Sequence, residues 1–332
     1  MSDQTFEFTK LPNLASERFG SAVLAANDEF FAPKEGLIKP NSPEWKDGLY
    51  TERGKWMDGW ETRRRREPGY DWAIIRLGLP GRVHGVVIDT SFFTGNYPER
   101  ASIDACAVAG VPSTDALTGN DVEWWPLLSP VDLRGNSTNV FVVEPTDRRV
   151  THLRLNIFPD GGVARLRVHG IVEPDAHVFA GQREVDLAAT EHGGFVVSCS
   201  DMHYGNPQNM LQPGRSTHMG DGWETKRRRG PGHDWAVVRL ARRAKIECIE
   251  LDFDHYKGNA PGRCMIEYCD AGTSSFDAER AVWETLVGES PVQPHSRHAF
   301  RDFSPASATH VRLNIYPDGG VARLRVLGRV DS

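Results

Sequence analysis

Two short segments of the chain combine acidic, hydroxyl and basic side chains in the same order. The first reads DGWETRRRR from Asp58 to Arg66, and the second reads DGWETKRRR from Asp221 to Arg229. A guanidinium group binds a carboxylate through two parallel hydrogen bonds, and glutamate is one of the side chains that transfer protons in catalysis. The two segments therefore indicate recognition of a small anion combined with acid–base chemistry.

The basic runs, Arg63 to Arg66 and Lys226 to Arg229, admit three interpretations. A nucleic-acid surface needs more clustered basic charge than two short runs provide in a chain with 39 basic and 45 acidic residues and a net charge of −6. A solvated strand edge is the second interpretation, because charge there prevents pairing with another strand. Anion recognition is the third, and it is the one we favour.

The carboxylates of the two segments also have structural alternatives. Asp58 and Asp221 each precede a glycine, and an Asp-Gly pair is typical of a tight turn, so a turn and a ligand contact both agree with the pattern. Glu61 and Glu224 lie beside arginines, with which they could form structural ion pairs instead of acting on a substrate. Both interpretations stay open at these four positions.

Histidines distinguish the surroundings of the two segments. The later part of the chain has His203, His218, His233 and His255, where the earlier part has Phe30, no clear counterpart, Tyr70 and Phe92. Imidazole suits proton transfer near neutral pH and also metal ligation. We therefore expect the more competent site in the later part, with scattered surface histidines as the alternative. No HExxH or comparable spacing is present, so a metal site would have to assemble from separate loops.

An internal duplication must position these residues. Asp58–Leu77 aligns with Asp221–Leu240 at 15 of 20 identical positions, and His152–Gly170 aligns with His310–Gly328 at 16 of 19. The chain is expected to consist of an N-terminal segment (1–19), a first repeat (20–172), a linker (173–193) and a second repeat (194–330). The mixed composition of the linker allows a short strand or helix.

Each repeat has the pattern of an all-β domain. The runs 72–77, 83–89 and 163–168 are short, β-branched and bounded by Gly, Pro or Asn, as strands are. In LRLNIFPDGGVARLRV, apolar and polar residues alternate on both sides of a turn, which predicts a hairpin with Arg165 and Arg167 on its polar face. Frequent turn signals without long amphipathic helices favour two tandem antiparallel jelly-roll β-sandwiches.

The composition is that of a globular protein outside the membrane. The 332 residues are 39% hydrophobic and 25% charged, and no stretch approaches the ~18 apolar residues of a membrane span. Five cysteines without a CxxC pair favour buried reduced thiols. The N-terminal segment has no apolar region like that of a signal peptide, so we expect a cytoplasmic location.

The doubled motifs resemble those of the allantoicase family. The resemblance rests on DGWETRRRR…GYDW with DGWETKRRR…GHDW, and on the endings FPDGGVARLRVHG and YPDGGVARLRVLG, and it covers nearly the whole chain. A looser likeness links each repeat to galactose-binding or discoidin-type jelly rolls. The resemblance implies hydrolysis of allantoate to (S)-ureidoglycolate and urea in allantoin and purine degradation, carried out by a homo-oligomer.

The implied substrate has one carboxylate and two ureido groups. Its site needs an arginine clamp, acceptors for the ureido N–H groups and an acid–base pair. In the second repeat we assign the carboxylate to Arg227 and Arg229 with Arg323 as a further candidate, the ureido groups to Asp221 and Asp234, and proton transfer to Glu224 and His233. The symmetrical alternative in the first repeat consists of Asp58, Glu61, Arg64, Arg66 and Asp71.

A non-catalytic function is the competing hypothesis. Tandem jelly rolls could bind a carbohydrate or another small polar ligand, although these loops are rich in Arg, Asp and Glu and do not predict an aromatic platform. A family member that has lost its activity would share the same motifs. The family has been associated with divalent metals, whereas no motif here requires a cofactor. We expect allantoate as the ligand, with neither nucleic acid nor membrane as a partner.

Overall fold

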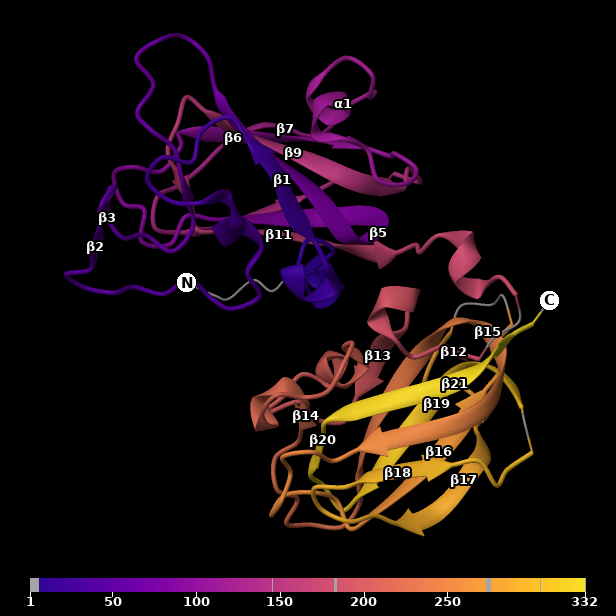
Figure 1. Cartoon of the computed structure of the whole chain (residues 1–332). Coiled ribbons are helices and arrows are strands. Elements are labelled where there is room, and N and C mark those ends of the chain that lie inside the picture. The colour runs from indigo at the N-terminus through magenta and orange to yellow at the C-terminus, as the bar shows by residue number, and fades with distance from the viewer. Residues whose placement is uncertain (1–5, 145, 182–183, 273–275, 305, 332) are drawn as a thin grey trace. The chain divides into compact units, whose positions relative to one another are not determined.

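The computed structural model describes residues 6–144, 146–181, 184–272, 276–304 and 306–331. The chain divides after Glu173 into two compact units (Figure 1). Each unit is an antiparallel β-sandwich of the jelly-roll type, so the expected fold class is confirmed. Within the described residues the one α-helix, α1 (Thr114–Thr118), is short, and no helix there is long and apolar enough to cross a membrane.

One long strand organises the first unit. Its main strands are β1 (Ala22–Ala26), β5 (Asp71–Asp89), β6 (Arg100–Cys106), β7 (Trp125–Asp132), β8 (Thr138–Val142), β9 (Val150–Phe158) and β11 (Arg165–Val172). The first half of β5 pairs with β1 and β9, and its second half pairs with β8 and β11. β6 continues the first layer from β9 towards β7. Because β5 belongs to both layers, it connects the two faces of the sandwich.

The second unit repeats this plan. Its main strands are β13 (Phe195–Cys199), β15 (Asp234–Asp252), β16 (Arg263–Cys269), β17 (Glu284–Pro291), β18 (Arg297–Phe300), β19 (Ser307–Tyr316) and β21 (Arg323–Val330). β15 pairs with β13 and β19 along its first half and with β18 and β21 along its second half. The expected strands at 72–77 and 83–89, and their later counterparts, are therefore halves of single long strands.

The hairpin predicted for LRLNIFPDGGVARLRV is wrong. Among the described strands, β9 and β11 each pair with β5 and not with each other, and β19 and β21 each pair with β15. The intervening turn carries the chain between layers, and the short strand β10 (Gly162–Val163) pairs with β4 (Trp60–Glu61). The alternation itself is observed, since Leu155 and Leu166 are both fully buried in one core. Strands that face each other across a core alternate in the same way as strands that lie side by side.

Each unit has a hydrophobic core of its own. Trp60 is fully buried in the first core and Trp223 in the second, where it belongs to β14 (Trp223–Glu224). β14 pairs with β20 (Gly320–Val321), as β4 pairs with β10. All five cysteines are free thiols, and Cys199 is the one that is not fully buried. Each of the two DGWET segments thus places its tryptophan in the hydrophobic core of its own unit.

Short elements complete both units. They are η1 (Glu7–Lys10), η2 (Glu17–Phe19), η3 (Lys34–Ile38), β2 (Tyr50–Thr51), β3 (Gly54–Lys55), η4 (Ala176–Phe179), β12 (Val185–Asp186), η5 (Thr190–His192), η6 (Pro207–Leu211) and η7 (Met219–Asp221). Asn13 pairs with His169 of β11, so part of the expected N-terminal segment packs on the first unit. β12 pairs with β21, which adds the end of the expected linker to the second unit.

Candidate active site

The Pro-Asp-Gly-Gly turn anchors the segment DGWET at one end of each sandwich. In the first unit the Thr62 amide donates to the Gly161 carbonyl, and the Gly161 amide donates to Thr62 Oγ1, both at 3.1 Å. Thr225 and Gly319 exchange the same two hydrogen bonds at 3.1 Å in the second unit. The turn therefore sets the position at which each arginine run begins.

Two glycines let this turn approach a neighbouring loop closely. Gly161 has a φ of 141°, and a Cβ there would lie 2.6 Å from the Pro98 nitrogen. Gly319 has a φ of 136°, and its Cβ would lie 2.6 Å from the Asn259 carbonyl oxygen. A side chain at either position would meet both backbone strain and a clash. The approach brings the loops that contain Asn96 and Asn259 against β4 and β14.

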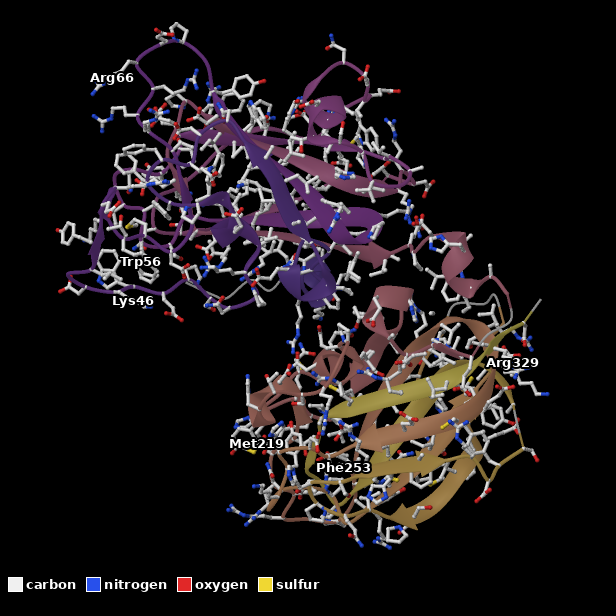
Figure 2. The ribbon with its side chains drawn as sticks, viewed as in Figure 1. Lys46, Trp56, Arg66, Met219, Phe253 and Arg329 are labelled. Carbon is white, nitrogen blue, oxygen red and sulfur yellow. The ribbon has the colours of Figure 1, made fainter. Side chains whose placement is uncertain are left out.

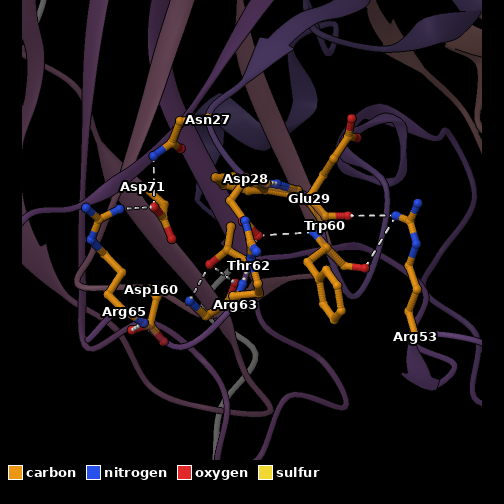
Figure 3. Close-up of polar contacts among 12 residues, drawn as sticks. Asn27, Asp28, Glu29, Arg53, Trp60, Thr62, Arg63, Arg65, Asp71 and Asp160 are labelled. Carbon is orange, nitrogen blue, oxygen red and sulfur yellow. Dashed lines mark hydrogen bonds and ion pairs between the residues drawn. The ribbon is translucent and has the colours of Figure 1, made fainter. Parts of the chain in front are cut away.

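The third arginine of the first run is held by buried partners. Arg65 Nη1 lies 2.6 Å from Asp71 Oδ1, and the Arg65 amide donates to Asp160 Oδ2 at 2.8 Å (Figure 3). Asn27 donates to the same Asp71 oxygen at 2.8 Å. Asp71 is only 1% exposed, and a buried carboxylate is stable only when it is paired and hydrogen-bonded. Arg65 and Asn27 provide these contacts.

The second unit builds the same network with one replacement. Arg228 forms an ion pair with the buried Asp234, and the Arg228 amide donates to Asp318 Oδ2 at 2.7 Å. Ser200 takes the place of Asn27 and donates to Asp234 Oδ1 at 3.0 Å. Arg65 and Arg228 are therefore the arginines that shape the two loops, and the sequence analysis did not single them out.

The arginines that the sequence analysis did select lie on the surface. Arg64 and Arg66, like Arg227 and Arg229, are exposed, and in the described part of the chain none of the four has an ion pair with a carboxylate. Figure 2 shows Arg66 extending away from its loop. These side chains are therefore available to an anionic ligand.

A polar groove lies beside Arg64 and Arg66 in the first unit. It has a volume of about 540 Å³ and is lined by Asn27, Asp28, the run Arg63–Glu67, and Asp71. Arg63 is held there by Asp28 at 2.7 Å. Asp71 Oδ2 is buried without a hydrogen-bond partner among the described residues. The groove thus combines exposed guanidinium groups with a buried carboxylate at its wall.

Each candidate glutamate accepts a hydrogen bond from an asparagine on the neighbouring loop. Asn96 donates to Glu61 Oε1 at 2.7 Å, and Asn259 donates to Glu224 Oε1 at 2.6 Å. Burial raises the pKa of Glu61 and outweighs the opposing effect of the Asn96 hydrogen bond. A carboxyl group that is harder to ionise is a better proton donor near neutral pH. The structural ion pairs with neighbouring arginines, which the sequence left open for these glutamates, are not among the described contacts.

The structure places Asp58, Asp221 and Arg323, which the sequence analysis assigned to the substrate, in two buried ion pairs. Arg323 lies 3.0 Å from Asp221 with both side chains 3% exposed, and Arg165 lies 2.6 Å from Asp58 with side chains 0% and 4% exposed. Both arginines were expected on a polar outer face. They are buried because each also donates to backbone carbonyls of the loop before β4 or β14. Each pair therefore ties the loop before β4 or β14 to the strand that follows the Pro-Asp-Gly-Gly turn, and Arg323 also lines a pocket of the second unit.

The four later histidines do not gather at one point. His233 contacts Asn314 and the ring of Tyr316, His255 contacts the Ser216 carbonyl and His295, and His203 packs edge-on against Tyr204. His218 precedes η7. Within the described ranges, no group of three or more His, Cys, Asp or Glu side chains is arranged to hold a metal ion. His233 adjoins the Arg228 network through its neighbour Asp234, and the His203 amide donates to Asp201, the partner of Lys226.

Several residues of the site were missed by sequence reasoning. They are Asn27, Arg65, Asn96 and Asp160 in the first unit, and Ser200, Arg228, Asn259 and Asp318 in the second. The one available indication was that Arg65, Asn96 and Asp160 are identical to their equivalents in the second repeat. Many other positions are also identical in both repeats, and the sequence does not show which loops lie in contact.

The fold and these loops define a class of tandem jelly-roll β-sandwich proteins whose repeated loops carry exposed arginines beside buried carboxylates. The allantoicase repeat model matches residues 12–173 and 185–331. The chain is 48% identical to "Probable allantoicase 1" of Burkholderia mallei over 98% of this chain and 97% of that one, and 46% identical to "Probable allantoicase" of Pseudomonas fluorescens SBW25 over 98% of each. A crystal structure of allantoicase from Saccharomyces cerevisiae matches with a TM-score of 0.79 and 37% identity over 96% of this chain and 93% of that one. The chain belongs to the allantoicase family.

Proposed function

We propose that this chain hydrolyses allantoate to (S)-ureidoglycolate and urea, a step in the use of nitrogen from allantoin and purines. The observation that carries the proposal is the pair of exposed arginines beside a buried carboxylate and a hydrogen-bonded glutamate, present in both repeats of a chain that matches the family along its length. A carbohydrate module would not need this charge.

The exposed arginines bind the substrate carboxylate. Arg64 and Arg66 in the first unit, or Arg227 and Arg229 in the second, offer guanidinium groups that are free of protein carboxylates among the described residues. Asp71 at the wall of the groove is the acceptor that we assign to a ureido N–H, which requires its buried Oδ2 to become accessible when the substrate binds. The reaction also requires the central carbon of the substrate to lie within reach of the glutamate.

Hydrolysis proceeds by expulsion of urea followed by addition of water. A glutamic acid, Glu61 or Glu224, protonates the departing ureido nitrogen as the bond to the central carbon breaks. The lone pair of the other ureido nitrogen forms a double bond to that carbon. Water then adds to the carbon and gives its proton to a base, which restores the glutamic acid over the cycle and leaves ureidoglycolate. The sum is allantoate plus water giving ureidoglycolate plus urea.

We further propose that the protein works in the cytoplasm as a homo-oligomer. No motif requires a cofactor, and a divalent metal ion in the reacting site is the alternative; activity that persists after exhaustive chelation would remove the metal. The free cysteines support a reducing compartment.

Urea release from allantoate by Glu61→Gln, Glu224→Gln and the wild type tests the catalytic assignment. The glutamine keeps the hydrogen bond from asparagine but cannot transfer a proton, so we expect at least one variant to lose about 100-fold or more in kcat. Glu123→Gln, on the surface far from these loops in sequence and 86% exposed at its side chain, is the control. Equal activity in all four proteins would contradict the assignment.

A further inference from the structure

A chain of polar side chains crosses the second unit and ends on His233. Arg312 Nε donates to Glu267 Oε2 at 2.7 Å, and the Asn314 amide nitrogen donates to the same oxygen at 2.8 Å. Asn314 Oδ1 then lies 3.0 Å from His233 Nε2. Asn314 is 2% exposed, and the polar atoms of a buried amide need hydrogen-bond partners within the protein.

This arrangement determines which imidazole nitrogen carries the proton. The Glu267 carboxylate, paired with Arg312, only accepts hydrogen bonds, so the group of Asn314 that faces it must be the NH₂. The carbonyl oxygen of Asn314 consequently faces His233, and it can only accept. His233 must therefore present Nε2–H to Asn314, which leaves Nδ1 as the nitrogen that gains or loses a proton.

The first unit contains the same chain without its last member. Arg154 pairs with Asp104 at 2.9 Å, and Asn156 donates to that carboxylate at 3.0 Å. Tyr70 occupies the position of His233 and packs on Phe158, as His233 packs on Tyr316. Asn156 Oδ1 is buried without a partner among the described residues. The two units thus share the support, but only the second has an imidazole for it to orient.

We infer that Asn314 and Glu267 are positioning residues that hold His233 with Nδ1 available as the base, and that proton transfer to or from water is therefore carried by the second repeat. This inference rests on the proposed hydrolysis of allantoate. His233 directly precedes Asp234, the partner of Arg228, so the base adjoins the loop that carries Arg227 and Arg229. The ring of Tyr316 packs against the imidazole at a tilt of 35°, with 4.6 Å between the ring centroids.

The tautomer can be measured independently of activity. Long-range ¹H–¹⁵N correlation spectra of the histidine-labelled whole protein report which ring nitrogen is protonated, and His233→Tyr identifies the signal among the 12 histidines. We expect an Nε2–H tautomer for neutral His233 in the wild type and a mixture of tautomers in Asn314→Ala. A neutral Nδ1–H tautomer in the wild type would overturn the inference, as would an unchanged tautomer in Asn314→Ala.

Kinetics with matched variants of the two repeats test the positioning role. Asn314→Ala is expected to lower kcat about 10- to 100-fold with KM changed less than about 3-fold, because the substrate still binds but the base is misplaced. Asn156→Ala removes the equivalent side chain in the first repeat and is expected to leave kcat within about 2-fold. Equal losses in both variants would show a purely structural role and contradict the inference.

His233→Tyr keeps the test informative if Asn314→Ala does not fold. Tyrosine is accepted at this position in the first repeat, where it stacks on Phe158, so we expect the variant to fold and to lose kcat at least as strongly as Asn314→Ala. Full activity of His233→Tyr would overturn the inference. A wild type that releases no urea would instead refute the proposed function, and the tautomer spectrum would still decide whether the network orients His233.

Discussion

Neighbouring arginines of one run have different roles, and burial separates them. Arg65 and Arg228 pair with carboxylates that are about 1% exposed, whereas the residues on either side of them point to solvent. An exposed cation adds little to stability but is free to bind an anion, while a cation that neutralises a buried carboxylate cannot be removed without a large cost. We therefore expect substitution of an exposed arginine to weaken substrate binding, and substitution of the adjacent paired arginine to lower stability.

Arg227→Gln combined with Arg229→Gln should raise KM for allantoate about 10-fold or more and leave the free energy of unfolding within about 0.5 kcal/mol. Arg228→Gln, between them, should instead destabilise the second unit by about 3 kcal/mol because Asp234 is left buried and unpaired. Steady-state kinetics and urea denaturation measure the two effects. Similar losses of stability in both variants would contradict the division of roles.

Glu61 should make stability depend on pH. Its pKa is raised by burial, so the folded state binds a proton more tightly than the unfolded state does. The stability that protonation provides is complete below the unfolded pKa, near 4.5, and is lost as the pH rises through the raised value. Glu61→Gln removes this loss and should unfold at a higher temperature than the wild type at pH 7, with the difference shrinking towards pH 4. A lower melting temperature of the variant at pH 7 would argue against the raised pKa.

For single residues, the sequence predicted which arginines are exposed better than it predicted which residues form ion pairs with each other. Arg64, Arg66, Arg227 and Arg229 were selected to bind the substrate carboxylate, and the structure leaves them exposed. Asp58 and Asp221 were selected for the substrate, yet each is buried against an arginine more than 100 positions away in sequence. No local pattern reports such a partner, because the pairing depends on how the layers fold together.

The order of strands shows the same limit at the scale of elements. Alternation of apolar residues predicted strands at both sides of the Pro-Asp-Gly-Gly turn, and β9 and β11 are found there. It also predicted that they pair, which is wrong because β9 pairs with the first half of β5 in one layer and β11 with its second half in the other. A short turn between alternating strands has the same sequence pattern whether the chain folds back within a layer or crosses to the other layer.

The buried ion pair at the start of β21 should be a main support of the second unit. Arg323→Met removes the buried guanidinium that pairs with the Asp221 carboxylate and should lower the free energy of unfolding by about 3–5 kcal/mol. Arg329→Met, on the same strand, removes a pair with Glu247 that is 56% exposed at the arginine and should cost less than about 1 kcal/mol. Chemical denaturation compares the two, and equal costs would contradict the structural role of the buried pair.

At the scale of the whole molecule, duplication gave two units with separate cores and different polar details. Leu155 and Leu313 are equivalent and fully buried, one in each core. Leu155→Ala should destabilise the first unit by about 2–5 kcal/mol and Leu313→Ala the second by a similar amount. We expect calorimetry to show each variant shifting a different part of the unfolding transition. Identical shifts of one single transition would show that the two cores unfold together.

Hydrolysis of allantoate by the intact chain is the activity on which the proposed site and mechanism depend. Incubating the purified protein with allantoate and following the reaction by NMR measures substrate and both products at once. We predict that allantoate disappears with formation of one urea and one ureidoglycolate per molecule. Binding of allantoate without release of urea would contradict this account and favour a non-catalytic function for the two repeats.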